Sequence, residues 1–312
     1  MGSNNTHREQ SPERLSAAAG GSGGSWYLLL EGLARLVQKY HPHLQLQAVE
    51  GGGVGNHRQV GLGEIPAAIL NPPMTVAALS GGEPFDRSYP DLRVGVANLT
   101  TNHLHFVAEQ STPLDSLPQW FANRYPLRVP VDRTSTVDRL VFRLALRHYG
   151  VSEDAVTAWG SRLFPANNYH EQLRLYQAGE VNALWQFMGI PSPSIAAAHQ
   201  ERPIRLLPLG DSLIDQLQEM GWNRATIPAG AYGIVAEPVA TVSMGTSLGF
   251  HRSVPDDIVF AIVSTICQQA DEVRRIHPAS LDFDPSLAAT NPGGPLHPGA
   301  IRYYQSRGVA IQ

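Results

Sequence analysis

The sequence predicts an α/β protein with two lobes and a hinge of two crossing strands. Short β-rich runs alternate with amphipathic segments throughout the chain, which is the pattern of strands followed by helices. A strand, a polar turn and a helix occur in that order near Leu15 and again near Leu127. Strand-like runs at Leu92–Leu99 and Ile204–Leu209 bracket the middle of the chain. This bracket predicts that one lobe is inserted into the other.

The first third of the chain predicts three strands, each followed by a helix. Leu15–Ala19 is a short apolar run, and apolar residues recur at helical spacing after Ser25. Leu44–Val49 alternates apolar and polar residues as a half-buried strand does, and a glycine loop separates it from a helix over 54–62. A third, buried strand is expected over 66–70, and the proline pair that follows it can start a helix.

The remaining two thirds continue the alternation. The helix that starts at Val137 has its apolar residues on one face and ends at Gly150. A long apolar helix contains Cys267, and the last helix follows Pro298. Strands are expected at Leu92–Leu99, His103–Glu109, Leu127–Val131, Val181–Phe187, Ile204–Leu209 and, as one or two strands, Val239–Phe250.

The predicted hinge strands divide the chain into lobes. We assign residues 15–98 and 204–312 to the first lobe and residues 99–203 to the second. Residues 1–14 are expected to be a disordered leader, because the N-terminus is polar and lacks an apolar signal core. If the protein is exported, we expect its signal to have been removed before this sequence begins. No apolar run is long enough to cross a bilayer.

Composition and charge limit the class of partner. Hydrophobic residues make up 43% and charged residues 16% of the chain, which allows a large core and excludes global disorder. The net charge of −4 argues against a nucleic acid or an anionic membrane as the main partner. Lys39 is the only lysine, so a carboxylate ligand would meet arginine. Cys267 is the only cysteine, which excludes an internal disulfide and favours a buried structural thiol.

A glycine-rich turn joins the first strand to the first helix and predicts an anion-binding cradle. Glycines let the backbone turn tightly and expose its N–H groups, and the helix N-terminus adds free donors and positive partial charge. We expect ligand contacts from Ser22, Gly23, Gly24, Ser25 and Tyr27. The turn has neither the spacing of a P-loop nor a following lysine, so it does not predict a nucleotide site. A turn that serves only as a strand–helix connection is the alternative.

Two further positions extend the candidate site of the first lobe. Gly52 lies in the glycine loop Glu50–Gly53, before the second predicted helix. Asn71 follows a buried strand and precedes Pro72, so its amide is expected at an edge of the lobe. Simple turn chemistry explains Asn71 equally well.

The second lobe repeats the order of strand, polar turn and helix. The turn Asp132–Thr136 carries hydroxyl groups that can cap the helix or donate to a ligand. Arg133 is the candidate for an ion pair with a ligand carboxylate, and a solvated surface arginine is the alternative. We expect Thr134, Ser135 and Thr136 to donate from the same turn.

Aromatic side chains are the candidates for an apolar wall of the site. Trp26 follows the first glycine-rich turn, and Trp185 and Phe187 flank Gln186 in a predicted strand. Gln186 would add one polar contact to this wall. An ordinary core face is the better explanation for at least one of the two aromatic residues of that strand.

The histidines do not predict a metal site. His41 with His43 and His103 with His105 are the only close pairs in the sequence, and neither has Cys, Asp or Glu nearby at ligand spacing. We therefore expect neither a metal nor another cofactor.

The tetrapeptide Gly210–Leu213 provides an enzymatic alternative. It matches the nucleophile block of GDSL-type esterases, with Ser212 as nucleophile and a histidine near the C-terminus as its base. That family has the block near the start of the chain, together with an Asp-x-x-His motif that this sequence lacks. Capping of a helix over 213–220 by Asp211 and Ser212 is therefore the favoured explanation.

Several motifs occur together in an order that matches a known family. They are the glycine-rich turn with Trp26-Tyr27, Glu50–Gly53, Asn71, Asp132–Thr136, Ile190–Pro193, Ile227–Tyr232 and His297–Ala300. In this order the chain resembles the TAXI family, the substrate-binding proteins of tripartite ATP-independent periplasmic (TRAP) transporters. The resemblance runs from about Leu15 to the C-terminus. It departs from the family pattern at Trp26-Tyr27-Leu28, at Asn71-Pro72-Pro73 and in the turn after Asp132.

The resemblance implies a fold and a function. It implies two lobes of the periplasmic-binding-protein type that close over a small organic acid, such as glutamate or 2-oxoglutarate, and deliver it to a TRAP permease in the membrane. We therefore expect a monomeric, extracytoplasmic solute-binding protein that is not an enzyme. Carboxylates and amino acids both stay open as ligands, because Asp132 can pair with an ammonium group.

Overall fold

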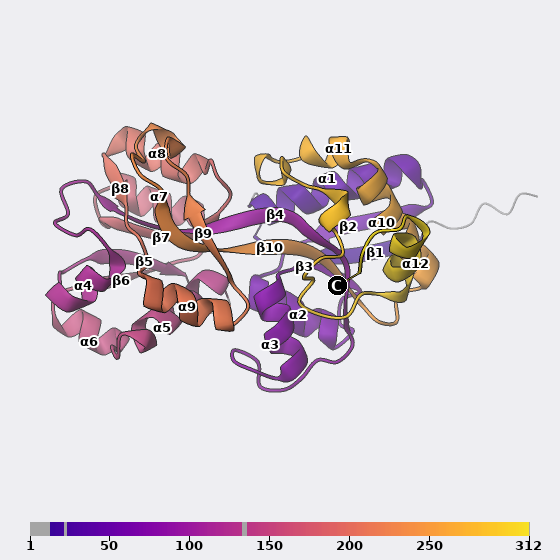
Figure 1. Ribbon diagram of the computed structural model, residues 1–312, viewed down its shortest axis with the longest axis horizontal. Coiled ribbons are helices and arrows are strands. Elements are labelled where there is room, and N and C mark those ends of the chain that lie inside the picture. The colour runs from indigo at the N-terminus through magenta and orange to yellow at the C-terminus, as the bar shows by residue number, and fades with distance from the viewer. Residues whose placement is uncertain (1–12, 22–23, 133–135, 312) are drawn as a thin grey trace, which may run out of the picture.

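The computed structural model describes residues 13–21, 24–132 and 136–311. Figure 1 shows two groups of helices and strands, joined by the long strands β4 (Leu92–Glu109) and β10 (Val239–His251). Lobe I denotes the group that contains β1 to β3, and lobe II denotes the group that contains β5 to β9. The predicted α/β class with two crossing strands is confirmed.

Lobe I is built on parallel strands with helices on both sides. The strands are β1 (Glu13–Ala18), β2 (Leu44–Val49) and β3 (Ala67–Leu70). The helices are α1 (Ser25–Tyr40), α2 (Gly53–Gly61), α3 (Pro72–Ser80), α10 (Asp256–Gln268), α11 (Ala270–Arg274) and α12 (Pro298–Ser306), with the 3-10 turns η2 (Pro278–Ser280) and η3 (Pro285–Leu287). The sheet order is β2–β1–β3–β10–β4–β7, and β10 runs antiparallel to β3 and β4.

Lobe II takes its elements from the middle of the chain. Its strands are β5 (Arg128–Asp132), β6 (Arg162–Ala166), β7 (Ala183–Met188), β8 (Ile204–Leu206) and β9 (Asn223–Ile227). Its helices are α4 (Leu117–Asn123), α5 (Val137–His148), α6 (Glu153–Ala158), α7 (Tyr169–Gln177), α8 (Pro193–Glu201) and α9 (Asp211–Glu219), with the 3-10 turn η1 (Ala231–Gly233). Strands β5 and β6 form a separate parallel pair, whereas β7, β8 and β9 extend the large sheet.

Apolar packing connects the two lobes on one face of the sheet. One cluster of buried side chains joins Leu70 and Met74 of lobe I to Trp120, Phe142 and Trp185 of lobe II. A second cluster, on α1, α10 and the strands between them, belongs to lobe I. The helical spacing of Leu29, Leu33, Leu36 and Val37 in α1 produces the apolar stripe that this second cluster buries.

The start of the chain and the hinge differ from the sequence prediction in two places. Glu13 and Arg14, expected in the leader, are part of β1 and pair with Leu44 and Gln45. The two strands predicted between Leu92 and Glu109 form the single strand β4.

Polar residues lie between the two predicted strands. They continue β4 because β10 supplies their hydrogen-bond partners. Thr100 Oγ1 donates to Thr246 Oγ1 over 2.6 Å, and Asn102 Nδ2 lies 3.1 Å from the same oxygen. Asn98 bends the strand with φ 56°, in the left-handed region that asparagine tolerates. Val239–His251 likewise forms one strand, β10.

The return from lobe II to lobe I occurs later than the sequence predicts. The predicted boundary lies at Ile204, but β8 pairs with the lobe II end of β4, from Val107 to Glu109. Strand β9 pairs with the first residues of β10, and Figure 1 shows α9 and β9 beside lobe II. The chain therefore returns to lobe I through β10. Before this return, Leu213 and Leu217 of α9 are buried in the same cluster as Trp120 of lobe II.

Helix ends confirm some of the expected turn chemistry and correct one detail. Helix α5 ends at His148, and Gly150 adopts φ 66°, as a C-terminal glycine does. Asp211 and Ser212 were expected to cap a helix at 213–220, but α9 starts at Asp211 and its N-cap is Gly210. Within the described residues, none of the helices combines the length and the apolar character needed to cross a membrane.

Candidate functional site

The carboxyl ends of the parallel strands β1, β2 and β3 place the N-termini of α1, α2 and α3, respectively, at one edge of the lobe I sheet. In α/β sheets, ligands bind at such an edge. Helix α1 has Gly24 as its N-cap and starts at Ser25, so both predicted residues lie at the helix start. No described side chain caps α1, so the N–H groups of its first turn have no intrahelical partner. Ser22 and Gly23, also predicted here, lie outside the described residues.

The glycine loop before α2 is held against the strand ends by Asn56. Asn56 Nδ2 donates to the carbonyl oxygens of Ala19 (2.7 Å) and Ile69 (2.8 Å), at the ends of β1 and β3. Asn56 Oδ1 accepts from Gly52 N over 2.8 Å. A side chain on Gly51 would overlap Asn56 Oδ1, which explains why glycine is needed there. Gly52 therefore donates its N–H to the protein, whereas the start of α2 is not capped by any described side chain.

Asn71 forms the third strand-to-helix junction. Its Oδ1 accepts from Met74 N over 3.2 Å and caps α3. The side chain is completely buried, yet Asn71 Nδ2 has no hydrogen-bond partner among the described residues. His57 Nε2 lies 3.1 Å from Thr75 Oγ1 and 3.3 Å from Asn71 O. Burial lowers the pKa of His57 to about 4, so its imidazole is neutral at physiological pH.

Ser247 is a second buried polar group next to this junction. Ser247 in β10 pairs with Leu70 in β3, the residue directly before Asn71. Ser247 is completely buried, and its Oγ has no partner within the described ranges. Sequence reasoning missed Ser247 because a serine in a strand gives no signal until its partners are known. The signal in the structure is two polar atoms near the end of β3, Asn71 Nδ2 and Ser247 Oγ, that are buried without partners among the described residues.

Lobe II meets this edge through the N-terminus of α5. A Cβ atom on Gly53 would lie 3.0 Å from Val137 Cγ2 and 3.8 Å from two ring carbons of Trp26. Thr136 caps α5, with Arg139 N donating to Thr136 Oγ1 over 3.1 Å. The predicted hydroxyl of Thr136 is therefore engaged in capping. Trp26 packs against the same cluster of buried side chains as Val137, and its role as a wall of the site stays a prediction.

Three predicted residues of this turn, Arg133, Thr134 and Ser135, lie outside the described residues. The residues that flank them form a buried acidic pair. Asp132 Oδ1 accepts from Gln172 Nε2 over 2.6 Å. Asp138 Oδ1 accepts from Phe187 N (2.7 Å) and Tyr169 OH (2.9 Å).

Burial changes the protonation of this acidic pair. It raises the pKa of Asp138 to about 8, and the neighbouring carboxylate of Asp132 adds to the shift. Burial also raises the pKa of Asp132. A proton is therefore favoured on Asp138 near neutral pH, which leaves one negative charge or none beneath the turn. Sequence reasoning assigned the charge to Asp132 alone and missed Asp138.

The predicted wall of lobe II lies in the interior. Trp185 and Phe187 are buried in the cluster shared by the two lobes, and Trp185 Nε1 donates to Asp138 O over 3.1 Å. Gln186 Nε2 donates to Gln172 Oε1 over 3.0 Å, and Gln186 Oε1 accepts from Ser194 Oγ. The side-chain polar atoms of Trp185 and Gln186 and the backbone N–H of Phe187 thus all have partners within lobe II. This favours the explanation of an ordinary core face, which the sequence left open.

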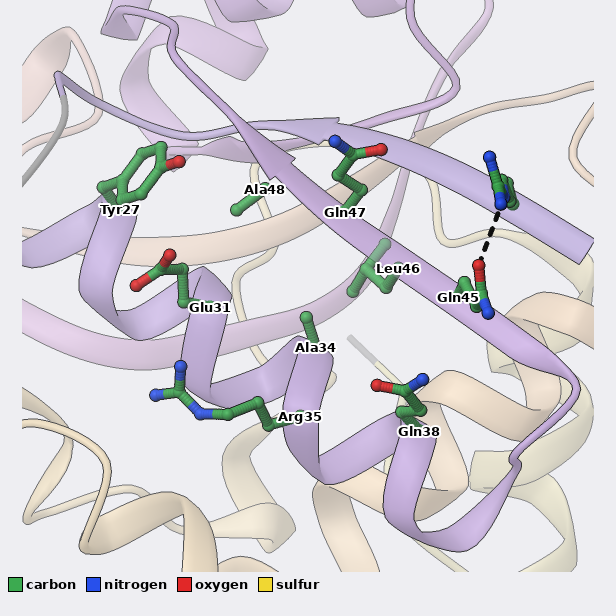
Figure 2. A pocket seen from close by; sticks show the side chains of 10 residues that line it. Tyr27, Glu31, Ala34, Arg35, Gln38, Gln45, Leu46, Gln47 and Ala48 are labelled. Atoms are coloured by element: carbon green, nitrogen blue, oxygen red, sulfur yellow. Dashed lines mark hydrogen bonds between the residues drawn. The ribbon is translucent and has the colours of Figure 1, made fainter.

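Tyr27 points away from the contact between the lobes. Its side chain lines a surface pocket of 530 Å³ between α1 and the edge strand β2 (Figure 2). Arg14, Glu31 and Arg35 also line this pocket, which carries both signs of charge. The structure therefore separates Tyr27 from Trp26, its neighbour in the sequence.

The two histidines near the C-terminus, expected to supply the base in the enzymatic alternative, are engaged elsewhere in the structure. His277 Nδ1 accepts from Ala279 N and His297 Nδ1 accepts from Gly299 N, so both histidines near the C-terminus cap helices. The histidine beside Ser212 is His148, at the end of α5. The described residues also contain no group of three or more His, Cys, Asp or Glu side chains arranged to hold a metal ion.

A comparison with protein families matches residues 17–308 of this chain to the NMT1-like family. The chain belongs to the NMT1-like family. Because the match covers both lobes, family membership applies to the whole described fold.

Three solved structures share the fold of this NMT1-like chain. MatC from Rhodopseudomonas palustris with bound malate is 15% identical, with a TM-score of 0.53 over 95% of this chain and 96% of that chain. A second R. palustris protein, with adipate, is 15% identical, with a TM-score of 0.51 over 84% of each chain. A putative phosphate ABC transporter substrate-binding protein from Clostridium perfringens, with bound phosphate, is 10% identical, with a TM-score of 0.51 over 85% of this chain and 98% of that chain.

At these identities the likeness concerns the fold alone. The NMT1-like chain therefore shares the mixed α/β fold of these proteins.

Proposed function

We propose that this NMT1-like protein captures a small organic anion between its lobes and performs no chemistry on it. The observation that carries the proposal is the presence of two buried, unpartnered groups near the end of β3, Asn71 Nδ2 and Ser247 Oγ. A buried polar group without a partner costs about 1–3 kcal/mol, so a ligand that bonds to either group offsets that cost. The uncapped starts of α1 and α2 lie at the same edge and favour negative charge.

Small carboxylates are the ligand class that we favour. The proteins of the same fold hold malate, adipate and phosphate, all of them small anions. Asn71 Nδ2 is a neutral donor, which suits a carboxylate oxygen. Amino acids such as glutamate stay open as well, because an ammonium group can pair with the carboxylate of Asp132 in lobe II.

Delivery to a membrane permease follows from the family resemblance. The motif order of the TAXI family supports a role as the extracytoplasmic binding component of a TRAP transporter. We expect a monomer that closes its lobes through β4 and β10. Uptake of the identified ligand into vesicles that contain the cognate permease should require this protein, and uptake that proceeds without it contradicts the delivery role.

A thermal-shift screen of carboxylates and amino acids tests capture directly, because a ligand that binds only the folded state raises Tm. Ser247→Ala provides the sharper test. Removing an unpartnered hydroxyl should leave the Tm of the free protein unchanged or raise it, whereas the affinity for the ligand should fall about tenfold, as for a lost hydrogen bond to a charged group. Ser264→Ala is the matched control, because Ser264 is buried in α10 and donates to Ala261 O.

The two variants distinguish a binding role from a structural one. If Ser247→Ala lowers the Tm of the free protein and leaves the affinity unchanged, Ser247 is a structural residue and the proposed site is wrong. If no carboxylate, phosphate or amino acid in the screen raises Tm, capture of a small anion is itself refuted.

A further inference from the structure

A serine and a histidine contact one another on the surface of lobe II. Ser212 Oγ, exposed in the first turn of α9, is 3.0 Å from His148 Nε2 at the end of α5. His148 Nδ1 is 2.6 Å from Gln216 Oε1, one helical turn after Ser212. An amide oxygen only accepts hydrogen bonds, so the proton of the neutral imidazole is on Nδ1. Nε2 therefore has the free electron pair that accepts the Ser212 proton.

The order of these contacts is that of a nucleophile, a base and a group that orients the base. Sequence reasoning missed the arrangement because His148 lies far from Ser212 in the chain. Strand β8 pairs antiparallel with β4 at the lobe II end, and α9, which follows β8, brings Ser212 beside His148. Tyr149, the residue after His148, donates its hydroxyl to Leu209 O over 3.3 Å, just before the turn that leads to Ser212.

The turn before Ser212 requires glycine. Gly210 has φ 86° and ψ 136°, a conformation that side chains disfavour. A Cβ there would also lie 2.6 Å from Pro118 Cγ and 3.2 Å from Tyr149 OH. The chain thus turns sharply from β8 into α9 and presents Ser212 in the first helical turn.

Helix α9 offers donors next to this serine. No described side chain caps its N-terminus, so the first N–H groups of the helix have no partner there. Backbone N–H groups at such a position can stabilise the oxyanion of an acyl-transfer intermediate.

We propose that Ser212 is a reactive nucleophile that takes acyl groups from small esters, with His148 as its general base. Ser212 Oγ attacks the ester carbonyl carbon while its proton moves to His148 Nε2. The carbon–oxygen bond to the leaving group then breaks, and the departing alkoxide takes the proton from His148. Water attacks the acylated serine with His148 again as the base, which releases the carboxylic acid and restores the Ser212 hydroxyl.

The chemistry of the site sets the expected rate and substrate. Gln216 is neutral, so it orients His148 but stabilises the imidazolium less than a carboxylate would. Turnover is therefore slow. Because Ser212 is exposed on a helix surface, the substrate is a small ester with a good leaving group. The site is independent of the lobe contact around Asn71, so the result bears on esterase activity and not on solute binding.

The test uses the full-length protein, a fluorophosphonate probe that labels reactive serines and 4-nitrophenyl acetate as the ester. Ser212→Ala should abolish labelling and ester hydrolysis. His148→Ala should slow both about a hundredfold or more, the usual contribution of a general base. Ser253→Ala is the matched control. Ser253 Oγ also contacts a histidine, at 2.7 Å from His251 Nδ1, but the same nitrogen accepts from Ser253 N, and both residues lie in one turn.

Each outcome decides the proposal. Labelling that depends on Ser212 and His148 but not on Ser253 supports it. Equal labelling of native and Ser212→Ala protein overturns it, and so does an unchanged rate in His148→Ala. Thermal unfolding of each variant checks that the fold is intact, and His148→Gln replaces His148→Ala if the latter does not fold. If the wild-type protein takes no probe, Ser212 is an ordinary surface serine and the proposal is refuted.

Discussion

The acidic pair of lobe II predicts an unusual dependence of stability on pH. Asp138 is buried, and its pKa rises from the ordinary value of 3.8 to about 8 in the folded chain. Between these values the folded state keeps the Asp138 proton while the unfolded chain has lost it. Stability falls with rising pH when the folded state binds more protons, so the free energy of unfolding should decrease from about pH 4 and level off above about pH 8.

The magnitude follows from proton linkage. Each pH unit between the two pKa values removes about 1.4 kcal/mol, less where the folded group is itself titrating. From pH 6 to pH 8 the loss is therefore about 2 kcal/mol. Asp138→Asn should remove this slope, because the amide is neutral and its Oδ1 can accept from the same Phe187 N and Tyr169 OH.

Urea unfolding, followed by tryptophan fluorescence at pH 6 and pH 8, measures the free energy of unfolding of the wild-type protein and of Asp138→Asn. Asp138→Asn should be more stable than the wild-type protein at pH 8, and the two should converge toward pH 4. Asp154→Asn is the control, because Asp154 is exposed in the first turn of α6 and should leave the slope as it is. A slope that persists in Asp138→Asn refutes the reasoning. An equal loss of stability at both pH values would show that the hydrogen bonds require an ionised carboxylate.

Three further changes test the lobe contact, the strand ends and the thiol. Gly53→Leu should weaken capture of the identified ligand at least tenfold and lower Tm, because Gly53 is buried and any side chain there meets Val137 across the contact between the lobes. Small-angle scattering in which the ligand compacts this variant as much as the wild-type protein would argue against it. Asn56→Ala should lower the free energy of unfolding by about 2–4 kcal/mol, since two buried carbonyls lose their donor. If chemical denaturation shows a loss of stability under about 1 kcal/mol, water replaces the amide. Cys267 should resist iodoacetamide in the native protein at pH 8 and react after unfolding, because burial raises its pKa to about 12; rapid native alkylation, measured by mass, would contradict this.

The sequence predicted the local elements well because their signals are local. Periodicity located α1 and β2, and β2 has the bounds that the sequence predicts. The glycine turns at Gly24 and Gly52 were found at helix starts, as the sequence predicts. Local signals do not show which distant strands pair. For this reason the sequence did not predict that β4 is one continuous strand, or that the chain returns to lobe I through β10.

The candidate site, too, was predicted in part from the sequence, whereas the rest became visible only in the structure. Asn71 was recognisable from the sequence, because an asparagine between a strand and a proline marks a junction. Its importance depends on Ser247, which β10 brings beside β3. Asp138 resembles any acidic residue in the first turn of a helix until α7 and β7 cover it and raise its pKa. Chain order thus determined which elements form, whereas tertiary contacts decided which polar groups lost water, and a polar group acquires an unusual pKa or an unmet hydrogen bond only when water is removed.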